Sequence, residues 1–233
     1  MRASDQVSIG WSDPGQVVGE FARSLMDVVR ERSRRIAGIY AAHGPLLTMQ
    51  RNQIVATFLD ESHAQWLLMV DTDVVLAVEA FDKLTAVAHA KERPVVGGLY
   101  FGLTSGPVPG QPPAGPAPLI YQDPEAPIPV WDYPEDTLIN VNATGAGCLL
   151  IHRSVLAQIR AHATKAEGRD WCWFLDLPVD GYWFGEDFYF CARVQAEGFP
   201  IVVHTGVVLP HRRQFWLDDR TQAGLPGGRP RAT

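Results

Sequence analysis

The chain has 233 residues, of which 46% are hydrophobic and 20% are charged, which is typical of a globular protein with one large domain or a domain with a subdomain. Its formal net charge of −6 argues against a protein that coats nucleic acid, although a local basic groove is compatible with that total. The three cysteines are too few and too scattered for a disulfide framework or a zinc cluster.

No targeting or membrane segment is expected. The stretch MRASDQVSIGWSDPG contains no apolar core of signal-peptide length. Nowhere do about 18 apolar residues follow one another, so we expect no membrane span. These features predict a cytoplasmic protein with reduced thiols.

Short apolar segments alternate with helical patterns in the first half of the chain. Val17, Phe21, Leu25 and Val28 form the apolar stripe of an amphipathic helix. The other expected helices cover residues 48–62 and 77–92, and the expected strands cover residues 6–11, 35–41, 66–70 and 94–101. This alternation predicts β-α-β units and a mainly parallel sheet, which binds ligands at the carboxyl ends of its strands.

The second half is less regular. Residues 105–118 are almost entirely Pro, Gly and small residues, which predicts an exposed loop. Beyond it we expect strands at 138–141 and 148–151, helices at 154–163 and 185–199, and an extended segment at 200–211. The polar tail that starts at Arg212 is rich in Gly and Pro and is expected to be flexible.

Two carboxylates directly follow a buried strand in the stretch WLLMVDTDV. Asp71 and Asp73 can both turn toward one point beyond the sheet, where their charges repel unless a cation lies between them. Carboxylate oxygens suit Mg²⁺ or Mn²⁺. The alternative is structural, with one aspartate capping the following turn and the other solvated.

A second acidic pair, Glu186 and Asp187, opens the helix expected at 185–199. Acids in a first turn interact favourably with the helix dipole by about 0.3–1 kcal/mol, which would explain one of them. Aromatic residues crowd the approach in DGYWFGED. In such surroundings a desolvated aspartate can act as a general base on a polar ring compound.

Two histidines lie near the end of the expected fold. His204, within IVVHT, has the pattern of a strand residue, whereas His211 comes immediately before Arg212 and Arg213. A neutral imidazole would complete a mixed oxygen and nitrogen site for Mn²⁺, and the arginines favour a phosphate-bearing ligand.

In this order, the motifs resemble those of the glycosyltransferases with the GT-A fold, particularly the family 2-like group, from about residue 6 to about residue 213. The segments that carry the resemblance are QRNQIVATFL, WLLMVDTDV, TGAGCLLIHRSVL, GEDFYFCARVQAEGF and VVLPHRR. The short first strand and the Pro-rich segment depart from the family pattern. The compact size looks like the small transferases of actinobacteria and their phages, and a phage-encoded protein would lie in the host cytoplasm.

The resemblance implies an α/β fold of the GT-A (Rossmann-like) type, with a mainly parallel central sheet flanked by helices and a small antiparallel portion on the acceptor side. It implies one catalytic domain over residues 1–211, followed by the tail at 212–233. Within that domain, a nucleotide-sugar half would cover about 1–104 and an acceptor half about 119–211, joined by the loop at 105–118.

The resemblance also implies roles for individual residues. Asp71, Asp73 and His211 would hold Mn²⁺ or Mg²⁺. Asp187, next to Glu186, would be the base that takes the proton from the acceptor hydroxyl. The donor-binding residues would be Trp11, Asp13, Arg51, Asp71, Thr72, Asp73 and Arg212. The donor would be a UDP-, GDP- or dTDP-sugar, and the acceptor a protein, a glycan, a lipid-linked intermediate or a modified nucleic acid.

Two other functions are compatible with the pattern. A nucleotidyltransferase of related fold would need a Gly-rich phosphate loop with a basic residue, and GWSDPGQVVGE lacks that residue. A non-catalytic sugar-nucleotide or glycan-binding protein would not need a positioned base. The joint presence of Asp71, Asp73, Asp187 and His211 therefore favours the transferase.

Overall fold

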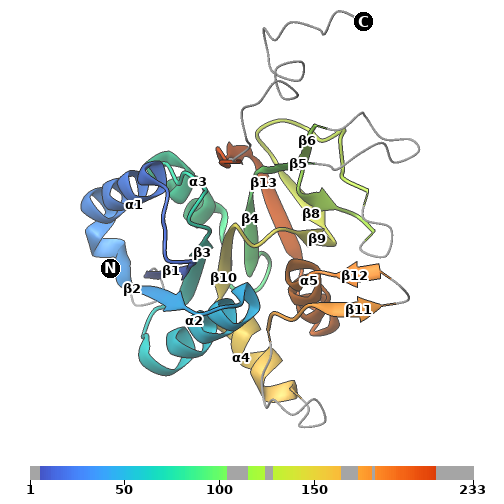
Figure 1. The fold of residues 1–233 in the computed structure, drawn as a ribbon, viewed down its shortest axis with the longest axis horizontal. Helices are drawn as coiled ribbons and strands as arrows, with labels where there is room; N and C mark the ends of the chain where they lie inside the picture. The colour runs from blue at the N-terminus through green and yellow to red at the C-terminus, as the bar shows by residue number, and fades with distance from the viewer. Residues whose placement is uncertain (1–5, 104–114, 124–127, 164–172, 180–181, 214–233) are drawn as a thin grey trace, which may run out of the picture.

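The computed structural model describes residues 6–103, 115–123, 128–163, 173–179 and 182–213, and a seven-stranded sheet forms its centre (Figure 1). The strand order is β2 (Ile36–His43), β1 (Val7–Asp13), β3 (Trp66–Val70), β10 (Cys148–His152), β4 (Val95–Leu99), β13 (Ile201–Val208) and β8 (Leu138–Val141). Only β10 and β8 run against the other strands. The prediction of a mainly parallel sheet is confirmed.

Helices cover both faces of this sheet. Helices α1 (Gly19–Arg32) and α3 (Val78–Val87) pack on one face, and α2 (Leu47–Glu61), α4 (Arg153–His162) and α5 (Glu186–Ala196) pack on the other. Along β3, Leu67 and Met69 belong to the core under α2, whereas Trp66, Leu68 and Val70 belong to the core under α1. Burial on both faces explains why this strand is an unbroken apolar run.

The small antiparallel portion expected from the sequence is also present. It consists of three strand pairs, β5 (Phe101–Leu103) with β6 (Pro116–Pro118), β7 (Ile120–Tyr121) with β9 (Ala143–Thr144), and β11 (Leu177–Val179) with β12 (Tyr182–Phe184). In Figure 1 the β5–β6 and β11–β12 pairs lie toward the β13 side of the central sheet. The expected α/β fold class is therefore confirmed, both for the mainly parallel central sheet flanked by helices and for the small antiparallel portion.

Two segments differ from the expectations. Helix α3 ends at Val87, because the Arg93 side chain donates to the Val87 carbonyl (2.6 Å) and the Arg93 N–H donates to the His89 carbonyl (2.9 Å), closing a turn. The loop expected at 105–118 lies outside the described residues up to 114, but Pro116–Pro118 forms strand β6. A short paired edge tolerates these prolines, since Ala117 supplies the one backbone N–H of β6.

The division of the chain into a nucleotide half and an acceptor half stays a prediction, and residues 214–233 of the expected tail lie outside the described residues. Among the helices that the structure describes, none has the length and apolarity needed to cross a bilayer.

Candidate active site

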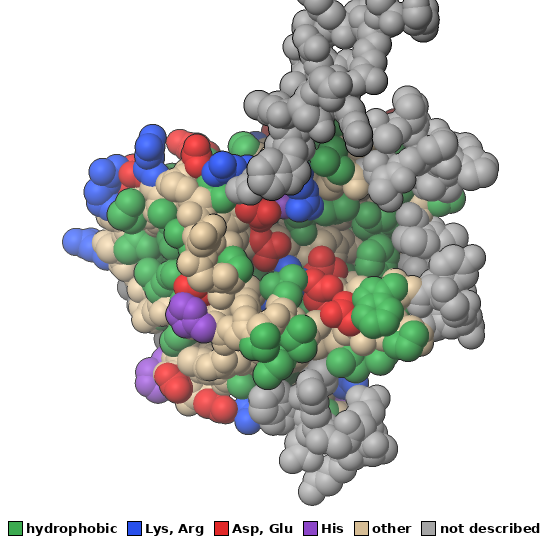
Figure 2. All heavy atoms as spheres, viewed as in Figure 1, with side chains coloured by type: hydrophobic (Ala, Val, Ile, Leu, Met, Phe, Trp, Pro, Cys, Tyr) green, Lys and Arg blue, Asp and Glu red, His purple; other side chains and the backbone are tan. Residues whose placement is uncertain are grey.

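A pocket of about 1100 Å³ opens where β1, β3 and β4 end. Its walls come from the loops after β1, β2 and β3, from the first turn of α5 and from the segment that follows β13. Figure 2 shows acidic side chains gathered in the hollow at the centre of the visible face. This is the position at which sheets of this type bind ligands.

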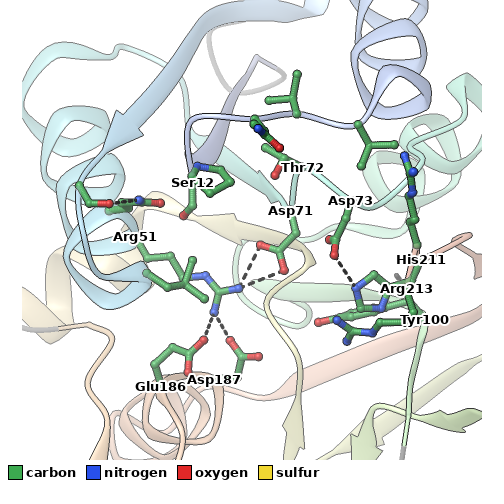
Figure 3. A pocket seen from close by; sticks show the side chains of 18 of the residues that line it. Ser12, Arg51, Asp71, Thr72, Asp73, Tyr100, Glu186, Asp187, His211 and Arg213 are labelled. Carbon is green, nitrogen blue, oxygen red and sulfur yellow. Dashed lines mark hydrogen bonds and ion pairs between the residues drawn. The ribbon is translucent and has the colours of Figure 1, made fainter. Parts of the chain in front are cut away.

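The loop Asp71–Thr72–Asp73 is held by its backbone. The Asp71 N–H donates to the Gly147 carbonyl (3.0 Å), and the Val74 N–H donates back to the Asp71 carbonyl (3.1 Å). The Thr72 carbonyl accepts from the Val18 N–H at the start of α1 (3.1 Å). These bonds fix the directions of both aspartates, which point into the pocket in Figure 3.

The segment after β13 brings His211 to Asp73. The Val75 N–H donates to the Pro210 carbonyl (2.9 Å), and the Arg212 N–H donates to the Asp73 carbonyl (2.8 Å). As a result, His211 Nε2 lies 3.3 Å from Asp73 Oδ2. Two of the expected metal ligands, more than a hundred residues apart in the chain, are therefore neighbours.

The imidazole of His211 has a defined tautomer. Its Nδ1 lies 2.8 Å from the Phe101 carbonyl oxygen, which can only accept, so Nδ1 carries a proton and Nε2 faces Asp73. The hydrogen bond to Asp73 raises the pKa of His211. Burial acts to raise the pKa of Asp73, but the hydrogen bond and charge of His211, together with the charge of Arg213, outweigh it and the pKa is lowered. The contact therefore favours the imidazolium form of His211 and the ionised form of Asp73.

A divalent cation fits this pair. A histidine that donates from one nitrogen to a backbone carbonyl and presents the other beside a carboxylate is the usual arrangement of a metal-binding histidine. Asp71 does not join them, since both of its carboxylate oxygens accept from Arg51 (3.0 and 3.2 Å). Within the described part of the chain, no group of three or more His, Cys, Asp or Glu side chains is arranged to hold a metal. Asp73 and His211 thus offer two protein ligands.

The acidic pair at the start of α5 faces Arg51. The guanidinium of Arg51 is 2% exposed, and its Nη1 lies 2.8 Å from Glu186 Oε1 and also contacts Asp187 Oδ1. Its Nη2 binds Asp71, so one cation joins three carboxylates (Figure 3). The sequence suggested Arg51 as a donor contact and gave no indication of these ion pairs.

The two acids differ from ordinary carboxyls. Burial, reinforced by the neighbouring Asp187 charge, raises the pKa of Glu186 to about 7. Burial also raises the pKa of Asp187, against the opposing effect of the Arg51 charge. A carboxylate with a raised pKa is a stronger base than an exposed one, which suits proton abstraction near neutral pH.

Tyr100, which the sequence did not single out, lies between these groups. It is 3% exposed, its hydroxyl accepts from the Gly147 N–H (2.8 Å), and its ring meets the His211 ring edge to face with centroids 5.3 Å apart. Burial and the charges of Asp187 and Asp71 raise its pKa well above the ordinary value. Tyr100 therefore stays a neutral phenol that contacts both sides of the site.

Gly145 and Gly147 make room for this phenol. A Cβ on Gly147 would lie 2.8 Å from Tyr100 Cζ and 2.9 Å from Asp71 Oδ2, and one on Gly145 would overlap the Tyr100 hydroxyl. The glycines of the NATGAG segment thus allow the backbone to approach the carboxylates closely. In the sequence, only the spacing of Gly145 and Gly147 could have indicated this close approach of the backbone.

The first-strand residues occupy different positions from those that the sequence suggested. Ser12, not Trp11 or Asp13, lines the pocket. Asp13 Oδ1 accepts from the Gly15 N–H (2.7 Å) and shapes the turn, and Trp11 packs edge to face on Phe21. The Ser12 hydroxyl and the Trp11 indole N–H are both buried with no hydrogen-bond partner among the described residues, so the fold itself leaves both polar groups unpaired.

Of the remaining expected site residues, Thr72 and the exposed Arg212 line the pocket, together with Arg213. His204 does not line it, and its Nδ1 accepts from the Gly206 N–H (3.2 Å) within the β13 region. The structure therefore gathers Arg51, Asp71, Thr72, Asp73, Glu186, Asp187, His211 and Arg212 around one pocket and leaves Trp11 and Asp13 outside its lining.

The architecture is that of the GT-A fold. A search of solved structures finds "A197 from STIV", with a TM-score of 0.56 and 19% identity over 90% of this chain and 86% of that one. It also finds "GalNAc-T7 with UDP, GalNAc and Mn2+", with a TM-score of 0.54 and 11% identity over 88% of this chain. The chain spans 43% of the length of that second structure. No known protein-family profile and no curated protein matches the sequence.

Proposed function

We propose that this protein is a glycosyltransferase that moves a sugar from a nucleoside-diphosphate sugar to an acceptor hydroxyl. One observation carries the proposal: the pocket of a GT-A fold has an Asp-Thr-Asp loop with a histidine on one side and a partly buried acid pair on the other. The structurally similar GalNAc-T7, whose structure holds UDP and Mn²⁺, supports the same reading.

On the donor side, Asp73 and His211 would hold Mn²⁺ or Mg²⁺. Such an ion, when bound, neutralises the negative charge that develops on the departing diphosphate. Arg212 and Arg213 line the same side and are placed to contact phosphate oxygens. The unpaired hydroxyl of Ser12 would donate to or accept from the nucleoside, a role that the sequence had suggested for its neighbours.

On the acceptor side, Asp187 would take the proton of the attacking hydroxyl. Its raised pKa makes it a stronger base, and its hydrogen bond with the Ala146 backbone fixes its orientation. Glu186, at the same pocket wall, would hold the acceptor or share the proton. The identity of the sugar and of the nucleotide is not part of this proposal.

A thermal-shift screen tests the proposal. UDP, GDP, dTDP and their hexose conjugates are each added with and without Mn²⁺, and we expect at least one nucleoside diphosphate to stabilise the protein only when Mn²⁺ is present. The matching sugar conjugate is then tested for release of the diphosphate. We expect Asp187→Asn to keep the stabilisation and to lose most of the release.

The results of this screen distinguish a glycosyltransferase from the two other functions considered. Stabilisation by a sugar nucleotide with no release and no transfer would indicate a binding protein. Stabilisation by nucleoside triphosphates instead of diphosphates would indicate a nucleotidyltransferase. Release by Asp187→Asn at the wild-type rate would contradict the role of Asp187 as the base.

A further inference from the structure

The guanidinium of Arg51 is fully engaged by the protein itself. It is 2% exposed, and its pocket-facing nitrogens contact three carboxylates: Nη1 binds Glu186 and Asp187, and Nη2 binds both oxygens of Asp71. A donor phosphate could reach these nitrogens only by displacing a carboxylate that Arg51 already holds. The exposed Arg212 and Arg213 line the same pocket, and the ion pair that Arg212 makes with Glu20 is long (4.0 Å) and exposed to solvent.

The surroundings of Arg51 hold it in this position. The next residue, Asn52, is buried, and its amide donates to the Phe174 carbonyl (2.7 Å) and accepts from the backbone N–H groups of Trp173 (2.8 Å) and Phe174 (3.1 Å). The Phe174 ring lies under the Arg51 guanidinium, 5.6 Å from its centroid, and stacks on Phe190 of α5 at 4.6 Å. Arg51 is therefore fixed relative to the helix that begins with the two acids.

The contacts of Arg51 join the two halves of the pocket. Asp71 stands at the end of β3 beside the metal-binding pair, and Glu186 and Asp187 stand at the start of α5. Without a cation between them, these three partly buried carboxylates would repel one another and move apart. One planar, forked cation can hold all three at once, which a lysine ammonium cannot do with the same geometry.

We propose that Arg51 is a positioning residue that sets Glu186 and Asp187 relative to the donor site, and that it does not bind the donor phosphates. This inference rests on the proposed function, and it assigns the donor phosphates to Arg212 and Arg213 instead. It predicts that changes at Arg51 reduce turnover and leave donor affinity intact.

The test compares Arg51→Lys with the wild type in two measurements. Calorimetry gives the Kd of UDP, GDP and dTDP with Mn²⁺ present, and release of diphosphate from the corresponding glucose conjugates, with water as acceptor, gives kcat and KM. We expect kcat to fall about 10- to 100-fold, since a misplaced base loses about this much, while Kd and KM change less than about twofold. Arg213→Ala should raise Kd and KM.

Arg153→Lys is the matched control. Arg153 also binds α2, donating to the carbonyls of Phe58 (3.0 Å), Leu59 (3.0 Å), Ser62 (2.6 Å) and Ala64 (2.9 Å), but it lies outside the pocket lining. Its substitution should lower the stability and leave kcat, KM and Kd unchanged. This control separates a loss of stability from a loss of positioning.

A rise of Kd by about tenfold or more in Arg51→Lys with kcat unchanged would overturn the inference, because that is the behaviour of a phosphate contact. Unchanged kcat and Kd would overturn it as well. If circular dichroism shows that Arg51→Lys does not fold, Phe174→Leu replaces it, since this change removes the ring under the guanidinium and keeps every charge. A wild-type protein that neither binds nor turns over any probe would remove the proposed function, and the inference with it.

Discussion

Glu186 is a single residue of the pocket whose raised pKa makes the folded state less stable near neutral pH. Its pKa is raised to about 7, mainly by burial and further by the Asp187 charge. In the unfolded chain the same carboxyl has its lower, ordinary pKa. As the pH rises between the two values, the unfolded state loses this proton first, so the folded state becomes less stable.

We therefore expect Glu186→Gln to gain stability relative to the wild type as the pH rises. Between about pH 4 and about pH 8 the difference in unfolding free energy should grow by about 1–3 kcal/mol in favour of the variant, because one pKa unit corresponds to about 1.4 kcal/mol. Urea denaturation at a series of pH values measures this difference. The same variant should lose activity.

Glu197 provides a control of opposite sign. Burial acts to raise its pKa, but hydrogen bonds from Gln158 and His162, together with the charges of His162 and Arg193, outweigh it and lower the pKa. This carboxylate stabilises the folded state above its ordinary pKa, so Glu197→Gln should lose stability relative to the wild type as the pH rises. A Glu186→Gln variant that behaves like Glu197→Gln would mean that the ion pair with Arg51 outweighs the cost of burial.

At the scale of elements, the turn between β9 and β10 determines how closely the backbone approaches the acids. Gly145 needs no unusual backbone angle, so the requirement for glycine there is steric. We expect Gly145→Ala to displace the Tyr100 hydroxyl and to cost about 1–3 kcal/mol, the usual effect of overpacking in a filled core. The melting temperature should fall, and the affinity for nucleotide in the presence of Mn²⁺ should decrease.

Gly185→Ala is the control for this substitution. Gly185 precedes α5, and a Cβ there would meet nothing within 4 Å. The control makes no new contact, so it should lose only the small N-cap preference of glycine over alanine and lower the melting temperature clearly less than Gly145→Ala does. Equal losses at Gly145 and Gly185 would show that backbone flexibility, and not the space beside Tyr100, explains the need for glycine.

Most elements were predictable because their signals are local. The unbroken apolar run at 66–70, the stripe from Val17 to Val28 and the acids opening α5 each depend on neighbouring residues. The reversed direction of β10 was not predictable, since a short buried strand reads the same in either direction. Strand pairing is decided by contacts between segments far apart in the chain.

At the scale of the whole molecule, the sequence identified which residue types gather at the pocket but not how they pair. It grouped Asp71 with Asp73 and His211, whereas the fold joins Asp71 to Arg51 and leaves Asp73 with His211. Arg51 and Asp187 are 136 positions apart, and no local pattern reports a contact over that separation. Ser12 and Tyr100 were missed for a related reason, since a small hydroxyl and a strand-end aromatic carry no distinctive motif.

The charge of the assembled pocket leads to a prediction for the whole protein. Asp71, Asp73, Glu186 and Asp187 bring four carboxylates, against the buried Arg51 and the exposed arginines after β13. A divalent ion that binds only the folded state should stabilise it, and Mn²⁺ at about 100 times its Kd contributes about 2.7 kcal/mol. For a chain of this size that corresponds to a rise in melting temperature of about 5–10 °C, which EDTA should reverse.

The histidine variants test where that ion binds. His211→Ala removes the imidazole beside Asp73 and should abolish most of the Mn²⁺-induced rise in melting temperature. His204→Ala removes a histidine of the same strand region that does not line the pocket, and it should keep the full rise. The reverse ranking would assign the ligand role to His204. An equal rise in both variants and the wild type would show that neither His211 nor His204 is a ligand of the ion.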